Sequence, residues 1–193
     1  MRVLVVDEGR IRRTWSRWLR PEGHEVSGCS TIREGARRLK REQTWDAILV
    51  ELDLPDGRAD KLLPHMSTEQ ARALVVLSAS LTAGPTIDLL GKGMWAIPKP
   101  TTGAPLLDLV EHVNEWRKTR QWTPQERVRL WAGRHELSAN QTQMLVLARG
   151  GLRDVHIATV LKWTERGVGM QWSQVFNKTG VRGRAAVIAA ALA

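Results

Sequence analysis

Five polar side chains follow short apolar runs in the first hundred residues, and their types suit the binding of a cation or a phosphoryl group. They are Asp7 and Glu8 after residues 3–6, Glu51 after 47–50, Ser78 after 73–77, and Lys99 after 94–97. Apolar runs without alternation are typical of strands buried on both faces of a parallel sheet. Because the carboxyl ends of parallel strands meet at one edge, these side chains are predicted to converge. Three clustered carboxylates repel one another, so the site requires a cation, either Lys99 or a bound Mg²⁺.

The elements that would position these residues alternate between strands and helices. Strands are predicted at 3–6, 25–28, 47–50, 73–77 and 94–97, and helices at 11–19, 31–41, 59–68 and 104–117, with a turn at 54–57 and a Gly- and Pro-broken stretch at 83–93. Repeated strand–helix–strand units predict an α/β fold with a five-stranded, doubly wound parallel sheet.

Charge divides the 193 residues into two parts of different character. Residues 1–116 hold 16 basic and 16 acidic side chains, whereas residues 117–193 hold 13 basic and 4 acidic ones, the whole excess of +9. A neutral module followed by a basic module favours binding of a polyanion by the second, the alternative being a solubilising surface. The length is enough for two small domains.

Secreted and membrane-spanning classes are not expected. Cys29 is the one cysteine, so no intramolecular disulfide framework forms, and the longest wholly apolar stretch, 185–193, has nine residues. A spanning helix needs about 20 apolar residues. Asp7 interrupts the N-terminal apolar run, which does not fit a signal peptide. A cytoplasmic protein without a membrane partner is predicted.

Four segments carry the strand-end residues: 3–8 (VLVVDE), 46–57 (DAILVELDLPDG), 75–79 (VVLSA) and 98–100 (PKP). Together they resemble the receiver domain of bacterial two-component response regulators, over residues 1–117. The resemblance implies that Asp7 and Glu8 hold Mg²⁺ and that Ser78 and Lys99 bind phosphoryl oxygens. It also implies that the residue four before the loop proline accepts a phosphoryl group from a histidine kinase.

At that position the chain has Glu51 in place of the family's aspartate. The extra methylene extends the carboxylate by about 1.5 Å, and a misplacement of about 1 Å can slow a reaction about 10²-fold. Poor or no phosphorylation is therefore expected at Glu51. Its carboxylate would instead lie near the place of a phosphoryl oxygen, within reach of Ser78 and Lys99, and would hold the domain in an active-like state.

Two further positions bear on switching. The family's Tyr or Phe three residues before the lysine is Ala96, and the adjacent Trp95 should point to the other face of its strand, so the usual rotamer switch is in doubt. Asp53 is an alternative phosphoryl acceptor, but Pro55 and Gly57 favour a loop with a solvated acid.

Residues 118–135 are predicted to form a basic linker with some helix. Its neighbourhood contains Trp116, Trp122 and Trp131, which are expected to dock on a neighbouring domain. Beyond it, helices are predicted at 139–148, 153–161, 165–177 and 184–192, with Ser138 and Thr164 as caps and glycines at 150, 151 and 180 as stops. Two short helices joined by a tight turn suggest a helix-turn-helix, the alternative being a four-helix bundle without a ligand.

The segments 137–145, 148–152, 156–158 and 176–186 resemble the LuxR-type helix-turn-helix of the NarL/FixJ regulator family, over residues 136–193. The resemblance places base contacts at Gly169, Met170 and Ser173, and none of these is basic. Phosphate contacts are expected from Thr164, Arg166, Lys178, Arg182 and Arg184, with Gln171 able to pair with adenine. Binding through the DNA backbone, with modest specificity, is predicted. Trp172 is assigned to the core, with a contact surface as the alternative.

The two resemblances imply a DNA-binding transcription regulator rather than an enzyme, with a pseudo-receiver that needs no aspartate phosphorylation. Double-stranded promoter DNA is the expected partner and a homodimer the expected state, through the Trp15/Trp18 helix, the 104–117 helix or the closing helix. No cofactor is required, Mg²⁺ is optional, and a partner protein or small molecule would supply the input. Two alternatives stay open: an ordinary phosphorylation-switched regulator, and a protein-interaction adaptor that no longer reads DNA.

Overall fold

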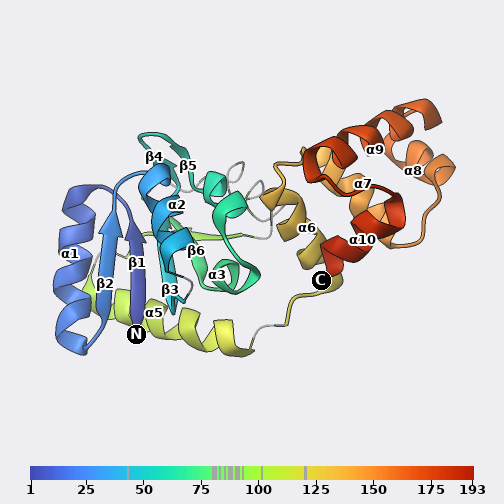
Figure 1. Ribbon diagram of the computed structural model, residues 1–193. Coiled ribbons are helices and arrows are strands. Elements are labelled where there is room, and N and C mark those ends of the chain that lie inside the picture. Colours follow the sequence, from blue (N-terminus) through green and yellow to red (C-terminus); the bar gives the residue numbers. More distant parts are fainter. Residues whose placement is uncertain are drawn as a thin grey trace. The chain divides into compact units, whose positions relative to one another are not determined.

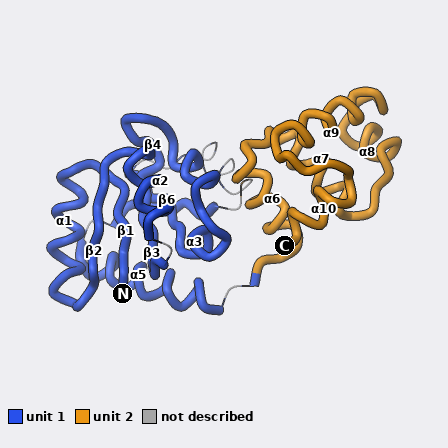
Figure 2. The backbone as a smooth tube through the Cα atoms, in the orientation of Figure 1, with its two compact units in different colours: residues 1–90, 94–121 blue, residues 91–93, 122–193 orange. Residues whose placement is uncertain are grey.

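The computed structural model describes residues 1–42, 44–79, 82, 84, 86, 89, 92, 94–100, 102–119 and 121–193. These form two compact units, the first with residues 1–90 and 94–121, and the second with residues 91–93 and 122–193 (Figure 2). No described helix combines the length and the apolar character that crossing a membrane would require.

The first unit is an α/β domain with a five-stranded, all-parallel sheet in the order β2-β1-β3-β6-β7 (Figure 1). Its elements are β1 (Arg2–Val6), α1 (Gly9–Leu19), η1 (Arg20–Glu22), β2 (Glu25–Cys29), α2 (Ile32–Arg41), β3 (Ala47–Glu51), β4 (Asp53–Leu54), β5 (Gly57–Arg58), η2 (Ala59–His65), α3 (Thr68–Arg72), β6 (Leu74–Ser78), β7 (Trp95–Pro98) and α5 (Gly103–Thr119). The predicted doubly wound fold is confirmed.

The apolar runs form the strands at the centre of this sheet. Residues 3–6 of β1 and 47–50 of β3 are fully buried, because helices cover both faces. On one face, α1 and α5 contribute the buried side chains Trp15, Leu106 and Val110. Trp15 therefore lies in the core, whereas Trp18 of the same helix is half-buried, so the Trp15/Trp18 helix stays a predicted dimer surface through its other side chains.

The segment after β3 differs from the simple turn predicted at 54–57. It is a small antiparallel hairpin, β4 with β5, whose Gly57 has a φ of 145°. At its tip the Asp56 carboxylate accepts hydrogen bonds from the amides of Ile32 and Arg33, at 2.7 and 3.0 Å. Slight burial raises the pKa of Asp56, but these amide hydrogen bonds outweigh it and lower the pKa. The hairpin is thereby fastened to the start of α2.

After the hairpin, the chain departs from the single helix predicted at 59–68. Instead of one helix at 59–68, the chain forms η2 and then α3, which begins at a capping box between Ser67 and Gln70. Pro64 removes a backbone donor inside η2, which prevents a continuous α-helix. Most of the predicted broken stretch 83–93 lies outside the described residues.

The second unit is helical. It contains α6 (Pro124–Arg134), α7 (Ala139–Arg149), α8 (Asp154–Leu161), α9 (Glu165–Thr179) and α10 (Arg184–Leu192). Ser138 caps α7 and Thr164 caps α9, whereas Gly180 ends α9 in the left-handed conformation, as predicted. The core includes Met144, Ile157 and Trp172.

The stretch predicted as linker, 118–135, contains α6, which packs against α7 and α10. Val128 and Ala132 of α6 are buried in the core of the second unit, and Trp122 is also buried. The second unit therefore begins near residue 122 rather than 136. The polar composition of this stretch obscured two apolar positions four residues apart, which share one helix face.

The Cys29 thiol is expected to be unreactive in the folded protein. Cys29 is 2% exposed at the end of β2, and burial raises its pKa to about 11, with nearby Arg38 opposing the shift. Because the thiolate is the reactive form, reaction with a thiol reagent at neutral pH should be about a hundredfold slower than in urea. Modification within seconds in native buffer would contradict this prediction.

Candidate functional site

The strand-end site is built around Lys99, which follows β7. Its ammonium lies 2.8 Å from Asp7 Oδ2, at the end of β1, and forms an ion pair with Glu51 Oε2, at the end of β3. The Lys99 amide donates to the Ser78 carbonyl oxygen at 3.0 Å, which holds the end of β7 beside the end of β6. Four strand ends thus meet, and Lys99 is the cation that the clustered carboxylates require.

Burial and charge determine the protonation of this cluster. The side chains of Asp7, Lys99 and Glu51 are 2%, 13% and 16% exposed. Burial alone would lower the pKa of Lys99, but its hydrogen bonds with Asp7 and Glu51 outweigh burial and raise it. Burial raises the pKa of Asp7, and the Lys99 ammonium only partly offsets that rise. The ammonium is therefore firmly charged and tightly held.

The second oxygen of each carboxylate is also engaged. Asp7 Oδ1 accepts from the Glu8 amide at 2.7 Å, and Glu51 Oε1 accepts from the Asp53 amide at 3.3 Å. Asp53 itself is exposed on β4, where it lies opposite Arg58 in the register of the hairpin. Asp53 thus contacts Glu51 through its backbone, which the sequence pattern did not indicate.

The predicted magnesium ligands do not converge. Glu8 lies at the N-cap of α1 with a side chain that is 63% exposed and 3.6 Å from Arg10. The Asp7 carboxylate is taken up by Lys99 and by the Glu8 amide. Within the described part of the chain, no group of three His, Cys, Asp or Glu side chains is placed to hold a metal. The side chains as arranged do not fit Mg²⁺.

The positions associated with switching flank the site. Ser78 is 5% exposed at the end of β6. Ala96 is half-buried on β7, in register with Val76. Trp95 meets Trp116 of α5 edge-on, with ring centroids 5.1 Å apart. No aromatic ring stands at position 96 to follow the state of the site.

In the second unit, the predicted DNA contacts fall into two sets. The exposed set comprises Thr164, Arg166, Met170, Ser173 and Arg182, beside Gly169, whose Cβ position has no atom within 4 Å. The second set, of which Lys178 and Arg184 are also exposed, bonds to other segments of the unit, whereas Thr164 and Ser173 of the first set bond only locally, with the Gly167 amide and the Gly169 carbonyl oxygen. Gln171 Oε1 accepts from Gln141 at 3.1 Å, and Lys178 donates to the Glu136 carbonyl oxygen at 2.8 Å. Arg184 forms an ion pair with Asp154.

Asp154 is a residue that sequence reasoning missed. Its carboxylate accepts from Trp172 Nε1 at 3.2 Å and pairs with Arg184, whose guanidinium lies 5.5 Å from the Trp172 ring centroid. Trp172 is 2% exposed, so its assignment to the core is confirmed. Asp154 thereby joins the starts of α8 and α10 to the middle of α9.

Replacing Asp154 with alanine should lower the free energy of unfolding by about 1–3 kcal/mol, because the Trp172 donor and Arg184 lose their acceptor. Urea unfolding followed by circular dichroism measures the loss. Glu165→Ala is the matched control, since Glu165 is also acidic in the first turn of a helix but is exposed. Equal losses in the two variants would show that only helix-terminal charge is involved.

No family model and no curated protein matches the chain. Solved structures do. A CheY-like response regulator receiver domain protein from Methanospirillum hungatei JF-1 has a TM-score of 0.54 and 24% identity, and covers 62% of this chain and 98% of its own. Response regulator StyR has a TM-score of 0.51 and 22% identity, and its match covers 97% of this chain and 96% of its own. Full-length FixJ from B. japonicum has a TM-score of 0.50 and 16% identity, and its match covers 97% of this chain and 94% of its own.

These likenesses establish the fold. The first unit has the fold of response-regulator receiver domains. Two of the similar structures, StyR and FixJ, extend over nearly the whole chain, so the order of a receiver fold and a following helical unit is shared with them.

Proposed function

We propose that the chain is a response regulator of the NarL/FixJ type that binds double-stranded DNA without aspartate phosphorylation. In this proposal its first unit is a pseudo-receiver, its second unit is the DNA-binding domain, and it acts in the cytoplasm as a homodimer. The observation that carries the proposal is the Lys99 ammonium held between the Asp7 and Glu51 carboxylates.

This ion pair would substitute for a phosphoryl group. In the receiver family the corresponding lysine binds a phosphoryl oxygen, and here a Glu51 oxygen occupies that role on Lys99. Glu51 carries the same single negative charge as an aspartate, but its longer side chain would bring that charge nearer to the place of a phosphoryl oxygen. A regulator with this site needs no kinase to reach one fixed conformation.

DNA binding is supported by charge and exposure in the second unit. Residues 122–193 hold ten basic and four acidic side chains, a net charge of +6 out of the +9 of the whole chain. Arg166, on the first turn of α9, and Arg182, just after it, are exposed and suit contacts with phosphates. Glycine at 169 and a methionine at 170 leave little capacity for hydrogen bonds to bases. We therefore infer binding through the DNA backbone with modest specificity.

The alternatives differ in their requirement for phosphate and for DNA. A phosphorylation-switched regulator would use Glu51 or Asp53, and only Asp53 is exposed. An adaptor that no longer reads DNA would be consistent with the internal bonds of Gln171 and Lys178. Both alternatives are outcomes of the experiment below.

The test uses a duplex selected from a random library by the unmodified protein. Fluorescence anisotropy should give the same Kd with and without acetyl phosphate and Mg²⁺, and intact mass should show no gain of about 80 Da. Glu51→Asp is the informative variant, because it restores the shorter carboxylate, and Glu51→Ala removes it. Phosphate-dependent binding would support the switched regulator, and failure to select any duplex would support the adaptor.

A further inference from the structure

Charge within the first unit is strongly polarised along the sequence. Residues 9–41, which form α1, η1, β2 and α2, hold ten basic and three acidic side chains, a net charge of +7. The remainder of residues 1–116 holds six basic and thirteen acidic side chains, a net charge of −7. The net charge of zero for residues 1–116 therefore conceals one strongly basic segment, residues 9–41.

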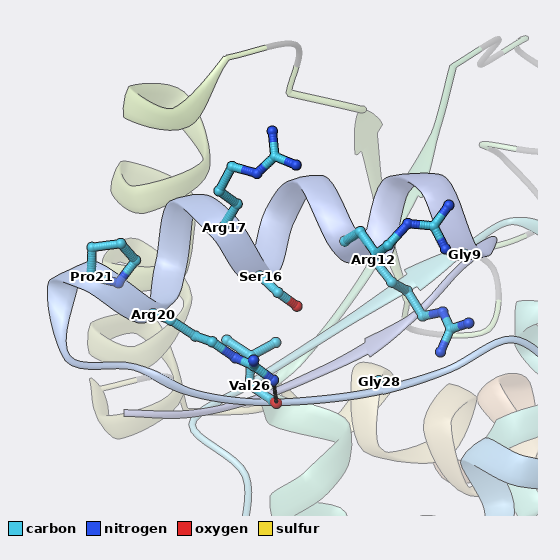
Figure 3. Close-up of a pocket in the computed structure, with 9 residues that line it drawn as sticks. Gly9, Arg12, Ser16, Arg17, Arg20, Pro21, Val26 and Gly28 are labelled. Atoms are coloured by element: carbon cyan, nitrogen blue, oxygen red, sulfur yellow. Dashed lines mark hydrogen bonds between the residues drawn. The ribbon is translucent and has the colours of Figure 1, made fainter.

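This segment contains β2, an edge strand of the sheet. Two arginines donate to the backbone of β2: Arg20 to the Val26 carbonyl oxygen at 3.4 Å, and Arg38 to that of Gly28 at 3.3 Å. Arg38 also donates to Ser27 Oγ at 2.5 Å. Figure 3 shows Arg20 reaching Val26 from the end of α1. Two guanidinium groups are thus fixed against the strand.

Two adjoining hollows lie along this edge and share Arg12 and Gly28. The first, of about 670 Å³, is lined by Gly9, Arg12, Arg13, Ser16, Arg17, Arg20, Pro21, Val26 and Gly28 (Figure 3). The second, of about 540 Å³, has Arg37, Arg38 and Arg41 of α2 on its other side. Both volumes lie in the range of small-ligand sites.

Arg12, which lies where the two hollows meet, is incompletely hydrogen-bonded. Arg12 Nε is buried without a hydrogen-bond partner, and the Arg12 stem crosses Gly28, where an added Cβ would lie 3.2 Å from Arg12 Cδ. The second hollow contains two carboxylates, but Glu34 accepts from the Ser30 amide and Glu42 pairs with Arg2. The shared junction is therefore an anion-attracting position.

We propose that these two hollows form one site for a compact oligophosphate, a small molecule with three or more linked phosphoryl groups. Arginine is suited to this chemistry, because its planar guanidinium binds phosphate oxygens in pairs. A compact anion fits better than a long duplex, which would extend from the basic segment towards a remainder with a net charge of −7. The proposal is independent of DNA binding by the second unit.

Isothermal titration calorimetry on the full chain tests this site, with inorganic tripolyphosphate, a nucleoside triphosphate and orthophosphate as probes at about 0.15 M ionic strength. Tripolyphosphate should bind one per chain and about tenfold or more tighter than orthophosphate. Equal binding of the nucleoside triphosphate means that the phosphates alone are recognised, whereas tighter binding of the nucleotide identifies it as the source.

Matched variants locate the binding. Arg12→Gln with Arg37→Gln should weaken tripolyphosphate about tenfold or more. Arg10→Gln with Arg33→Gln removes the same charge from exposed positions on the same helices, outside the two hollows, and should leave the affinity within about twofold. Circular dichroism verifies that each variant is folded.

Three results would overturn the proposal: no saturable binding of tripolyphosphate, equal loss in the two pairs of variants, or loss caused by Arg166→Ala with Arg182→Ala in the second unit. If Arg12→Gln with Arg37→Gln lost duplex affinity, and the unaltered chain did not bind tripolyphosphate, the two hollows would be assigned to nucleic acid instead. Because duplex binding is measured separately, failure here is distinguishable from failure of the proposed regulator function.

Discussion

Replacing Lys99 with methionine is expected to lower the free energy of unfolding by about 3–5 kcal/mol, because it leaves two largely buried carboxylates without their cation. Methionine keeps the length and apolar stem of the side chain, so the loss reports charge rather than packing. Urea unfolding at neutral pH, followed by tryptophan fluorescence, measures the difference from the unaltered protein.

The pH dependence of this loss gives a sharper test. In the unaltered protein the pKa of Lys99 is raised, so its contribution is complete below the unfolded pKa near 10.5 and is lost as pH rises through the higher folded value. In Lys99→Met, burial of Asp7 raises the pKa of that carboxyl with no ammonium to oppose it. Protonation then relieves the buried charge, so the variant should regain stability as pH falls from about 7 to about 5.

Two controls separate this effect from a general loss of charge. Lys40→Met removes an exposed lysine of α2 and should change stability by less than about 0.5 kcal/mol. Adding Glu51→Gln to Lys99→Met should recover part of the loss, which a double-mutant cycle quantifies. A difference between Lys99→Met and the unaltered protein that is small and independent of pH would contradict the ion-pair account.

The second large effect is expected on DNA affinity. Arg166→Ala with Arg182→Ala should weaken binding to the selected duplex about tenfold to a hundredfold, and should reduce the slope of log K against log salt by about 2. Both arginines are exposed, so neither substitution should lower the free energy of unfolding by more than about 0.5 kcal/mol. Anisotropy titrations at several salt concentrations measure both quantities.

Arg149→Ala is the matched control, because Arg149 is an exposed arginine of the same unit, at the end of α7. It should retain the affinity and salt slope of the unaltered protein. Arg184→Ala should instead reduce stability, since Arg184 pairs with Asp154. If Arg149→Ala weakened binding as much as the double variant, DNA binding would reflect overall charge rather than a surface around α9.

Much of the fold could be predicted because the signals are local and repeated. The buried strands are unbroken apolar runs, and the parallel arrangement then brings Asp7, Glu51 and Lys99 to one edge. Glu8 could not be placed in this way, because a residue just past a strand can turn outwards, and Arg10 offered it a partner at the surface.

Contacts between residues far apart in the sequence could not be predicted, because they depend on how the helices pack. Asp154 meets Trp172 and Arg184, residues 18 and 30 positions away, and only the packed helices define that geometry. In the same way, the buried side chains of α6, among them Val128 and Ala132, lie within a basic stretch, so the packing of α6 against α7 and α10 was not evident. The polarised charge of residues 9–41 was readable from the sequence, but its arrangement around β2 was not.

Gly169 on α9 has a consequence for which substitutions this protein can accept. An added Cβ at Gly169 meets nothing within 4 Å, and any residue other than proline would favour the helix more than glycine does. A side chain with donors or acceptors can therefore be accepted there without disturbing the core beneath it. Under the proposed DNA-binding function, one substitution on this helix would add a preference among duplex sequences without a change to the packed helices beneath it.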